Sequence, residues 1–445
     1  GRVGGSGANG STSRDWKNYF QAVPKDELEK RIWAEDDKLG WFINRVTEPV
    51  LAREKQVVKN EKRARVDNQP YGHNSYVIDK HLFPEDHPYH WQVIGSLEHV
   101  QAATLDDVKA FFAQWYVPNN ATLSIAGDFD FAQAKQWVEK YFAEIPRGRD
   151  IQRLPKRPGK LQQNINLFHE DNFASLPQLT LVWPTVEAYH PDEYALAVLV
   201  EYLSQGKQAP LHKELIEQQE VTSDIAMISR HSEIAGQLYL SIRAFDGTAL
   251  DDVADGVDEA LKQFEKDGIS QVDLDRIKAG QETQFYQSLS SVLGKSISLA
   301  RYNVLAGEPG YAEQAINNIL NVSVADVMRV YETYIKGKYR IATSFVPKGQ
   351  LSLALRGSVQ ASIAEENIAS EAQDNFDLSE QVFYQPTPSS FDRSEEPPYG
   401  ESYEVSTPPV WQYSSNNGLT YLGIKNEEVP LVEANLVIQG GALLD

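Results

Sequence analysis

Apolar and polar residues over positions 14–146 follow helical spacing in some segments and strand spacing in others. After Pro24, and again over 105–115, apolar residues recur every three or four positions, which is typical of amphipathic helices. Thr104 and Asp107 form a capping-box pattern at the start of the second of these helices. A turn at 118–120 leads to residues 121–126, which alternate as in a strand, and a further helix then follows.

The same order of elements recurs near residue 323. Ser323 and Asp326 repeat the capping pattern, a helix and a glycine-containing turn follow, and residues 339–343 alternate as a strand. The same helix, turn and strand occurring twice predict a duplicated domain. We therefore expect an α+β fold in which two related domains, at 1–155 and 164–350, each pack helices against a mainly antiparallel sheet.

Within the second copy, residues 179–183 and 236–242 have the pattern of strands. Residues 194–203 are apolar almost all round, which predicts a buried helix. Ser270 begins a segment that predicts one long helix running towards Tyr302.

Residues 351–409 differ in composition from what precedes them. They are acidic and contain several Pro and Ser residues, which predicts a linker. Residues 416–418 then mark a turn, and apolar residues alternate over 432–438. We interpret 410–445 as the start of a third, truncated sheet domain, and the whole chain as a piece of a longer protein.

The composition excludes several classes of function. The net charge of −21 leaves no basic surplus for binding nucleic acid. No uninterrupted apolar run reaches about 18 residues, so the sequence predicts no membrane span. The chain has no Cys, which excludes disulfides and thiolate–zinc sites.

Two glutamates seven residues apart, Glu54 and Glu61, lie in a predicted helix over 49–65. At about 100° per residue they fall within about 20° of each other, on an arc that also holds Val57 and Ala64. The opposite side carries the basic residues Lys55, Lys59, Lys62 and Arg63. A buried carboxylate must be paired, hydrogen-bonded or bound to a metal. Either arginines from another helix neutralise these acids, or the acids serve a metal or catalytic site.

With its surroundings, this segment resembles the zinc-glutamate helix of the pitrilysin/insulinase family of zinc metallopeptidases, the inverted zincins. Residues 7–20 resemble the Asn-Ala-x-Thr strand of that family and the Tyr-Phe that follows it. Other short matches follow in the family's order: Pro70-Tyr71-Gly72, His87-Pro88-Tyr89, 116–121 and Gly127-Asp128. The series covers essentially the whole chain, and the resemblance implies the family's two-repeat architecture.

The resemblance also implies a role for individual residues. Glu61 matches the third protein ligand of the zinc ion, and Glu54 matches the acid one heptad earlier that supports the site. The edge strand that pairs with the backbone of a substrate is matched by Asn9, Gly10, Ser11 and Thr12. Gly10 stands where the family usually has Ala, which loosens the strand slightly but keeps its backbone hydrogen-bonding groups.

The family's remaining zinc ligands and its general base come from a His-x-x-Glu-His motif. That motif is absent from residues 1–445, which fits a truncation upstream of Gly1. The resemblance therefore implies an intact protein that is a Zn²⁺-dependent metalloendopeptidase acting on peptides or unfolded polypeptides. A second half of the same polypeptide would close a chamber around the zinc, and the fragment alone would be inactive.

Two other functions remain open. One is a non-catalytic scaffold of the same fold, as in core subunits of respiratory complexes or non-catalytic subunits of processing peptidases. The other is a peptide-binding half that pairs with a separate catalytic chain, although the linker and third domain argue against it. His87 and His90 lie in a Pro-containing loop, and we interpret them as structural rather than as metal ligands. Single-chain relatives with two repeats are often exported, so we expect a bacterial periplasm or cell envelope.

Overall fold

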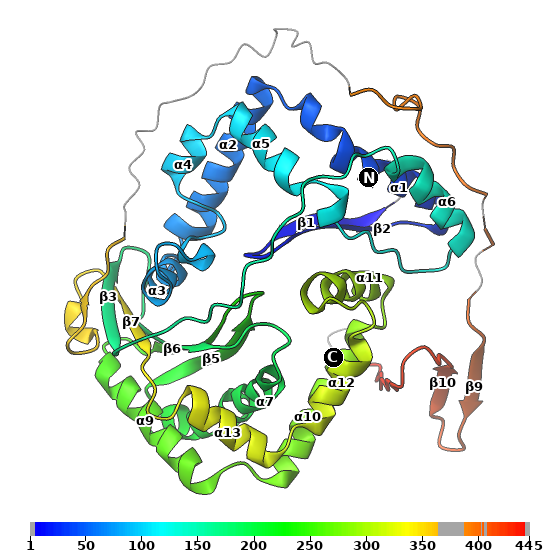
Figure 1. Cartoon of the computed structure of the whole chain (residues 1–445). Helices are drawn as coiled ribbons and strands as arrows, with labels where there is room; N and C mark the ends of the chain where they lie inside the picture. The colour runs from blue at the N-terminus through cyan, green and yellow to red at the C-terminus, as the bar shows by residue number, and fades with distance from the viewer. Residues whose placement is uncertain (1–4, 364–386, 402, 405–406, 441–445) are drawn as a thin grey trace.

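A computed structural model describes residues 5–363, 387–401, 403, 404 and 407–440. The elements fall into two groups, one around a small hairpin and one around a larger sheet (Figure 1). We call the elements of residues 6–142 the first unit and those of residues 165–360 the second unit. Helices and a mainly antiparallel sheet together make an α+β fold, as the sequence predicts.

The first unit holds a two-stranded antiparallel sheet, in which Asn9 of β1 lies opposite Phe20 of β2. The strands are β1 (Ser6–Thr12) and β2 (Lys17–Ala22). The helices are α1 (Leu28–Gly40), α2 (Glu48–Lys62), α3 (Asn74–Leu82), α4 (Leu97–Ala102), α5 (Leu105–Trp115) and α6 (Phe131–Phe142). Short 3₁₀ or π turns are η1 (Lys25–Glu27), η2 (Phe42–Arg45), η3 (Arg63–Asp67), η4 (Pro88–His90) and η5 (Pro118–Asn120).

The second unit is built on a six-stranded sheet of order β5-β6-β4-β7-β3-β8, in which β3 runs parallel to β7 and β8 and the other pairs are antiparallel. Its strands are β3 (Ile165–Asp171), β4 (Gln178–Thr185), β5 (Thr222–His231), β6 (Gly236–Ala244), β7 (Ile341–Pro347) and β8 (Val359–Gln360). Its helices are α7 (Asp192–Ser204), α8 (Pro210–His212), α9 (Leu250–Asp267), α10 (Gln271–Ser288), α11 (Val292–Arg301), α12 (Ala312–Asn321) and α13 (Val324–Tyr334), with turns η6 (Lys213–Gln218), η7 (Tyr302–Ala306) and η8 (Leu351–Leu353).

Both faces of the six-stranded sheet are covered. On one face the core includes residues of α7, α9, α10 and α13, and Leu181 of β4 points into it. On the other face Val182 packs with Val77 and Ile78 of α3, a helix of the first unit. Because a strand alternates its side chains between faces, the almost entirely buried strand β4 needs cover on both sides. The first unit supplies one of these covers, so the two units share a core.

The predicted long helix after Ser270 is interrupted. α10 ends at Ser288, and α11 begins at Val292. The hydroxyls of Ser288 and Ser290 donate to the carbonyls of Phe285 and Gln287, at 2.6 and 2.7 Å, while Ser291 caps α11 by accepting from the Gly294 N–H at 2.9 Å. Serine hydroxyls compete with helical backbone hydrogen bonds and favour caps. The helix is therefore broken by these serine hydrogen bonds, which the periodicity of apolar residues does not reveal.

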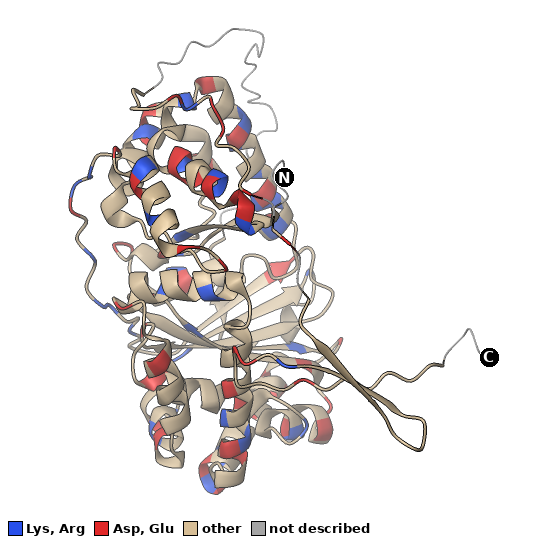
Figure 2. Cartoon of the chain, turned by 90° about the vertical axis from the view of Figure 1, so that its right-hand side faces the viewer, with Lys and Arg blue, Asp and Glu red and all other residues tan. Residues whose placement is uncertain are grey.

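Two predicted strands are wrong. Residues 121–126 and 432–438 do not pair with any strand of the described residues. The turn at 416–418 is confirmed, because it joins β9 (Val410–Ser414) to β10 (Thr420–Ile424) in an antiparallel hairpin. This hairpin projects from the rest of the protein (Figure 2). Alternation alone does not make a strand, since an extended segment also needs a neighbour to satisfy its backbone groups.

The predicted linker over 351–409 is wrong at its start, because η8 and β8 belong to the second unit and β8 pairs with β3. Residues 387–401 of the same stretch lie on the first unit. Arg393 pairs with Asp36 of α1 at 2.6 Å and with Glu144 at 2.9 Å, and its guanidinium covers the ring of Trp41. The Gly400 N–H donates to the carbonyl of Asp26 at 2.9 Å. Residues 364–386 of the predicted linker lie outside the described residues.

Candidate active site

The two glutamates lie on α2, which begins at Glu48 with Thr47 at its N-cap and a Pro in its first turn. The Thr47 hydroxyl makes no cap hydrogen bond. The helix passes into the π turn η3 at Arg63. Pro is tolerated in the first turn of a helix, where its missing N–H would have no partner within the helix. The Pro in this segment therefore favours a helix that begins here.

The covered face of α2 differs from the predicted one. Its buried residues are Leu51, Ala52, Lys59 and Lys62. Lys59 donates to the Gln101 side chain at 2.6 Å, and Lys55 donates to the Gln101 carbonyl at 3.0 Å. Long lysine stems pack along the neighbouring α4 while their ammonium groups reach hydrogen-bond acceptors. The side that carries the basic residues is therefore the side that packs.

The predicted burial of Glu54 and Glu61 is wrong. The Glu54 side chain is 53% exposed and pairs with Arg53 at 3.1 Å. The Glu61 side chain is 38% exposed and pairs with Arg65, itself 78% exposed, at 3.0 Å. Exposed ion pairs of this kind contribute little to stability. A metal ion is therefore not needed to make these acids tolerable, although both carboxylates remain accessible.

Zinc fits this surface only in part. Glu61 offers one accessible carboxylate, a donor that zinc accepts. Among the described residues, however, no three His, Cys, Asp or Glu side chains gather closely enough to hold a metal ion. A zinc ion at Glu61 would need further ligands from outside these residues.

Strand β1 has the form expected of a peptide-binding edge. All seven of its residues are exposed, and in the described residues it pairs with β2 alone, so its other edge is free. Asn9, Gly10, Ser11 and Thr12 form most of this strand, as the sequence predicts. The Asn9 side chain accepts from the Gly10 N–H at 2.8 Å. An edge strand with unpaired backbone groups can pair with an extended chain.

His87 and His90 are structural, as predicted. His87 is buried against Phe83, with its Nε2 2.9 Å from the Arg157 carbonyl, and its Nδ1 accepts from the Tyr89 N–H. Burial lowers the pKa of His87 below its usual value. His90 Nδ1 lies 2.8 Å from the carbonyl of Phe83. Both rings are used in fixing the loop.

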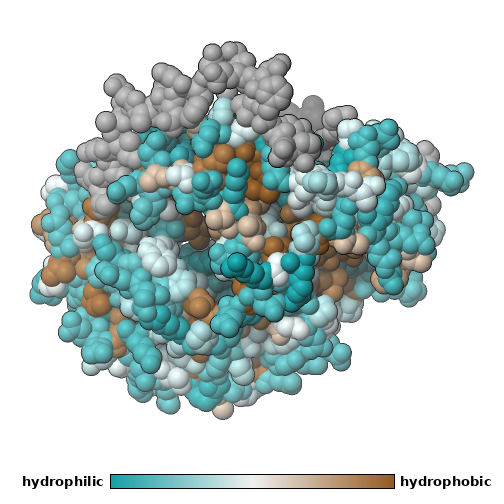
Figure 3. Space-filling view, turned by 45° about the horizontal axis from the view of Figure 1, so that its top comes forward, coloured by the Kyte–Doolittle hydropathy of each residue, from teal (hydrophilic) through white to brown (hydrophobic). Residues whose placement is uncertain are grey.

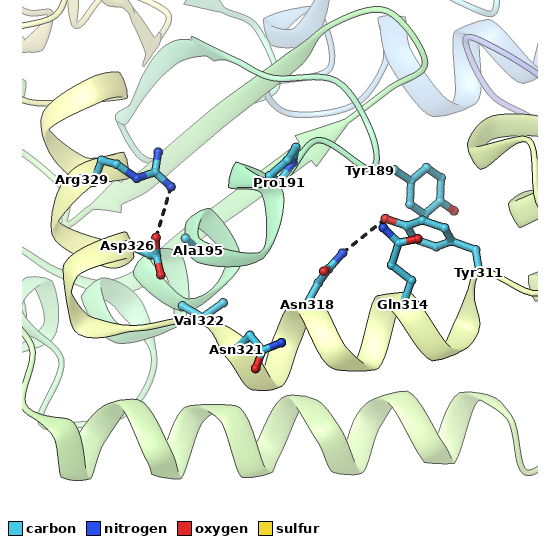
Figure 4. A pocket seen from close by; sticks show the side chains of 10 residues that line it. All are labelled: Tyr189, Pro191, Ala195, Tyr311, Gln314, Asn318, Asn321, Val322, Asp326 and Arg329. Atoms are coloured by element: carbon cyan, nitrogen blue, oxygen red, sulfur yellow. Dashed lines mark hydrogen bonds and ion pairs between the residues drawn. The ribbon is translucent and has the colours of Figure 1, made fainter.

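A cavity of about 250 Å³ lies away from these residues, between α7, α12 and α13 (Figure 4). It is lined by Tyr189, Pro191, Ala195, Tyr311, Gln314, Asn318, Asn321, Val322, Asp326 and Arg329. Arg329 is held by Asp192 at 2.8 Å and Asp326 at 3.5 Å, and burial raises the pKa of Tyr189 to about 12. The lining lacks a nucleophile beside a base, so it does not have the form of a catalytic site.

Sequence reasoning missed one group of residues. Arg14 and Asp15 follow β1 within the segment that carries the resemblance, but no pattern assigned them a role. In the structure they contact Asp79 and Tyr89, which lie far along the chain. A single sequence carries no signal for contacts over 65 or more positions.

Comparison with known proteins finds a matching family model and several similar proteins. The family described as "Peptidase M16 inactive domain" matches residues 102–281. The chain is 27% identical over 351 residues to the zinc protease PqqE of Helicobacter pylori, covering 75% of each chain. A protease from H. pylori of known structure superposes with a TM-score of 0.71 at 25% identity, over 78% of this chain and 82% of that one.

A second solved structure shares the fold. The first half of the periplasmic protease PqqL from Escherichia coli superposes with a TM-score of 0.62 at 17% identity, over 84% of this chain and 82% of that one. Residues 102–281 match the M16 inactive domain. The chain is therefore similar in sequence and fold to proteins named as M16-type or zinc proteases.

Proposed function

We propose that residues 1–445 form part of a zinc-dependent metalloendopeptidase that hydrolyses short or unfolded polypeptides. In this proposal β1 binds the substrate backbone, Glu61 is one zinc ligand, and Glu54 supports the site. The free, fully exposed edge of β1 carries the proposal, because such an edge binds an extended chain by adding a strand. Relatives named as zinc proteases support the metal.

A bound zinc ion would lower the pKa of a coordinated water to about 7 and so supply hydroxide at neutral pH. Within residues 1–445, Glu61 would hold the ion, and its pairing with the exposed Arg65 is weak enough to be exchanged for it. The two histidines must come from sequence outside these residues, since they contain no His-x-x-Glu-His. Strand β1 would hold the peptide extended beside that site.

The wider organisation is also a proposal. We place a partial first domain at 1–155, a related domain from 164 to the end of β8, a linker from there to 409 and the start of a third domain at 410–445. The named first half of PqqL supports a second half on the same polypeptide, which would close a chamber. Its description as periplasmic supports a periplasmic or cell-envelope location. No helix in the described part of this chain is long and apolar enough to cross a membrane.

The test uses the full-length protein that contains residues 1–445. Zinc content measured by mass spectrometry and cleavage of unfolded β-casein are the two readouts. Glu61→Gln should lower both by about 100-fold or more, and Glu54→Gln should lower activity about 10- to 100-fold. Glu48→Gln, on the exposed first turn of the same helix, is the matched control and should leave both unchanged.

Residues 1–445 alone should bind no stoichiometric zinc and cleave nothing. Zinc-dependent cleavage by this chain alone would overturn the ligand assignment. A full-length protein that binds no zinc and lacks an intact His-x-x-Glu-His motif would favour the scaffold function instead. The scaffold function needs no metal site, and the described residues contain no group of three metal-binding side chains.

A further inference from the structure

The turn that follows β1 is held far more firmly than the strand itself. Residues 13–16 join β1 to β2, and Arg14 and Asp15 are partly buried there, whereas every residue of β1 is exposed. Both turn side chains contact the shared core of the two units. The free strand is therefore attached to the protein mainly through its hairpin partner β2 and this turn.

Arg14, Gln237 and Asp79 form a closed ring of polar contacts. The Arg14 guanidinium donates to the Gln237 side chain at 2.9 Å and forms an ion pair with Asp79. Gln237 in turn donates to Asp79 at 2.8 Å, and Gln92 donates to the same carboxylate at 3.0 Å. Asp79 has no exposed side-chain surface. A buried carboxylate depends on such partners, and the rigid fork of Arg fixes their geometry.

Asp15 makes the second attachment. One of its carboxylate oxygens accepts from the Tyr89 hydroxyl, and the other accepts from the Glu233 N–H at 2.9 Å. The Tyr89 hydroxyl accepts from the Ile234 N–H at 3.1 Å, and the Arg14 guanidinium lies 5.0 Å from the centre of the Tyr89 ring. Burial, and then the nearby Asp15, raise the pKa of the Tyr89 hydroxyl.

The partners of this turn belong to different elements. Asp79 lies on α3, Tyr89 on η4, Gln237 on β6, and Glu233 and Ile234 in the loop between β5 and β6 of the second unit. The turn is therefore fixed relative to the six-stranded sheet as well as to the first unit. Moving that sheet would move the end of β1.

We propose that Arg14 and Asp15 are positioning residues that hold the edge of β1 ready for a peptide and tie its placement to the second unit. This inference rests on the proposed role of β1 in substrate binding. A peptide that adds to an edge loses less entropy on binding when that edge is already fixed. Loosening the turn should therefore weaken peptide binding even though neither side chain contacts the peptide.

The test measures binding of fluorescein-labelled β-casein to residues 1–445 by anisotropy, together with amide hydrogen exchange of residues 6–12. Arg14→Lys keeps the charge opposite Asp79 but loses the planar guanidinium that contacts both Gln237 and Asp79. Asp15→Asn keeps only one acceptor oxygen, so it can accept from the Tyr89 hydroxyl or from the Glu233 N–H but not from both. Each should raise Kd about fivefold and speed exchange in β1, with sheet amides of the second unit unchanged. Arg31→Lys is the matched control, since Arg31 contacts Gln21 of β2 at 2.9 Å outside this network.

The outcomes separate two failures. If β-casein gives no added protection to residues 6–12 in the unsubstituted chain, the proposed role of β1 is wrong. If protection is seen but the Arg14 and Asp15 variants bind as tightly as Arg31→Lys, the positioning role is wrong. A purely structural role would lower the unfolding temperature without changing Kd measured well below it, which also contradicts the inference.

Discussion

The repeated helix–turn–strand segments, at 104–126 and 323–347, begin alike and end differently. Both helices have eleven residues and a complete capping box, formed by Thr104 with Asp107 and by Ser323 with Asp326. None of the residues of α5 is buried, whereas α13 buries Val327, Val330 and Tyr331. The extended segment after α13 is the central strand β7, but residues 121–126 pair with no strand among those described.

This difference separates what local sequence decides from what neighbours decide. The capping residues and helical spacing suffice to form both helices. Burial and strand pairing require a partner, and the second unit supplies β3 and β4 on either side of β7. Residues 121–126 are instead held by the side chains of Ser296, which donates to the Ser124 carbonyl at 3.0 Å, and Asn303, which donates to Thr122 at 2.9 Å. The first copy therefore leaves Phe111, Trp115 and Leu123 about 40% exposed. Figure 3 shows that apolar residues also reach the surface on the face that it draws.

A charged substitution in the two extended segments gives the largest predicted contrast. Ile341 is fully buried in β7, so Ile341→Lys should cost about 4 kcal/mol or more and unfold the second unit. Leu123 is 42% exposed, so Leu123→Lys should change stability by less than about 0.5 kcal/mol. Urea unfolding followed by circular dichroism measures both. Equal losses would mean that residues 121–126 are covered in solution, which would break the comparison.

Truncating an aromatic residue at the matching position of each helix gives an intermediate contrast. Tyr331 packs edge-on against Phe264 in the core, so Tyr331→Ala should cost about 3–5 kcal/mol. Phe112 stacks on Tyr116 but is only half-buried, so Phe112→Ala should cost about 1 kcal/mol. Native-state hydrogen exchange of α13 and α5 amides measures each loss.

Tyr331→Phe is the control for the first of these variants. It removes only the hydroxyl that donates to Glu265 at 2.8 Å and should cost about 1 kcal/mol. A loss for Phe112→Ala as large as that for Tyr331→Ala would show that α5 is as well packed as α13.

The sequence-based predictions are confirmed where the local sequence alone determines the structure. Both predicted capping boxes are present, at the starts of α5 and α13. The predicted strands at 179–183 and 236–242 lie in β4 and β6, and the predicted buried helix at 194–203 lies in α7. The predictions are wrong where the outcome depends on what packs against a segment. The face of α2 that packs is chosen by Gln101 on α4, which binds Lys55 and Lys59, so the apolar arc around Glu61 is left open.

In the candidate site, too, local features could be predicted and long-range contacts could not. The exposed edge strand at residues 9–12 could be predicted because its residues are consecutive in the sequence. Arg14 and Asp15 could not be assigned, because Asp79, Tyr89 and Gln237 reach them only through the folded chain. The roles of Glu54 and Glu61 remain predictions.

The smallest predicted effect tests the feature that the two segments share. Thr104→Ala and Ser323→Ala each remove a cap hydroxyl and should destabilise their helices by about 1 kcal/mol, in spite of the difference in burial. Hydrogen bonds from Thr104 hold the pKa of Asp107 below 3.8, and hydrogen bonds from Ser323 do the same for Asp326. Because these pKa values are lowered by folding, the caps contribute fully above pH 3.8 and are lost as the pH falls through the lowered values.

NMR titration of the carboxyl carbons of Asp107 and Asp326 measures how strongly each cap is supported by neighbouring charges. In Thr104→Ala the pKa of Asp107 should rise only part of the way to its ordinary value, because the backbone N–H of residue 104 still donates to its carboxylate at 2.8 Å. In Ser323→Ala the pKa of Asp326 should stay lower than that of Asp107 in Thr104→Ala, because the backbone N–H of residue 323 still donates to it at 3.0 Å and Arg329 also lies 3.5 Å away. Identical titrations in the two variants would show that Arg329, which also binds Asp192, gives the second cap no electrostatic support.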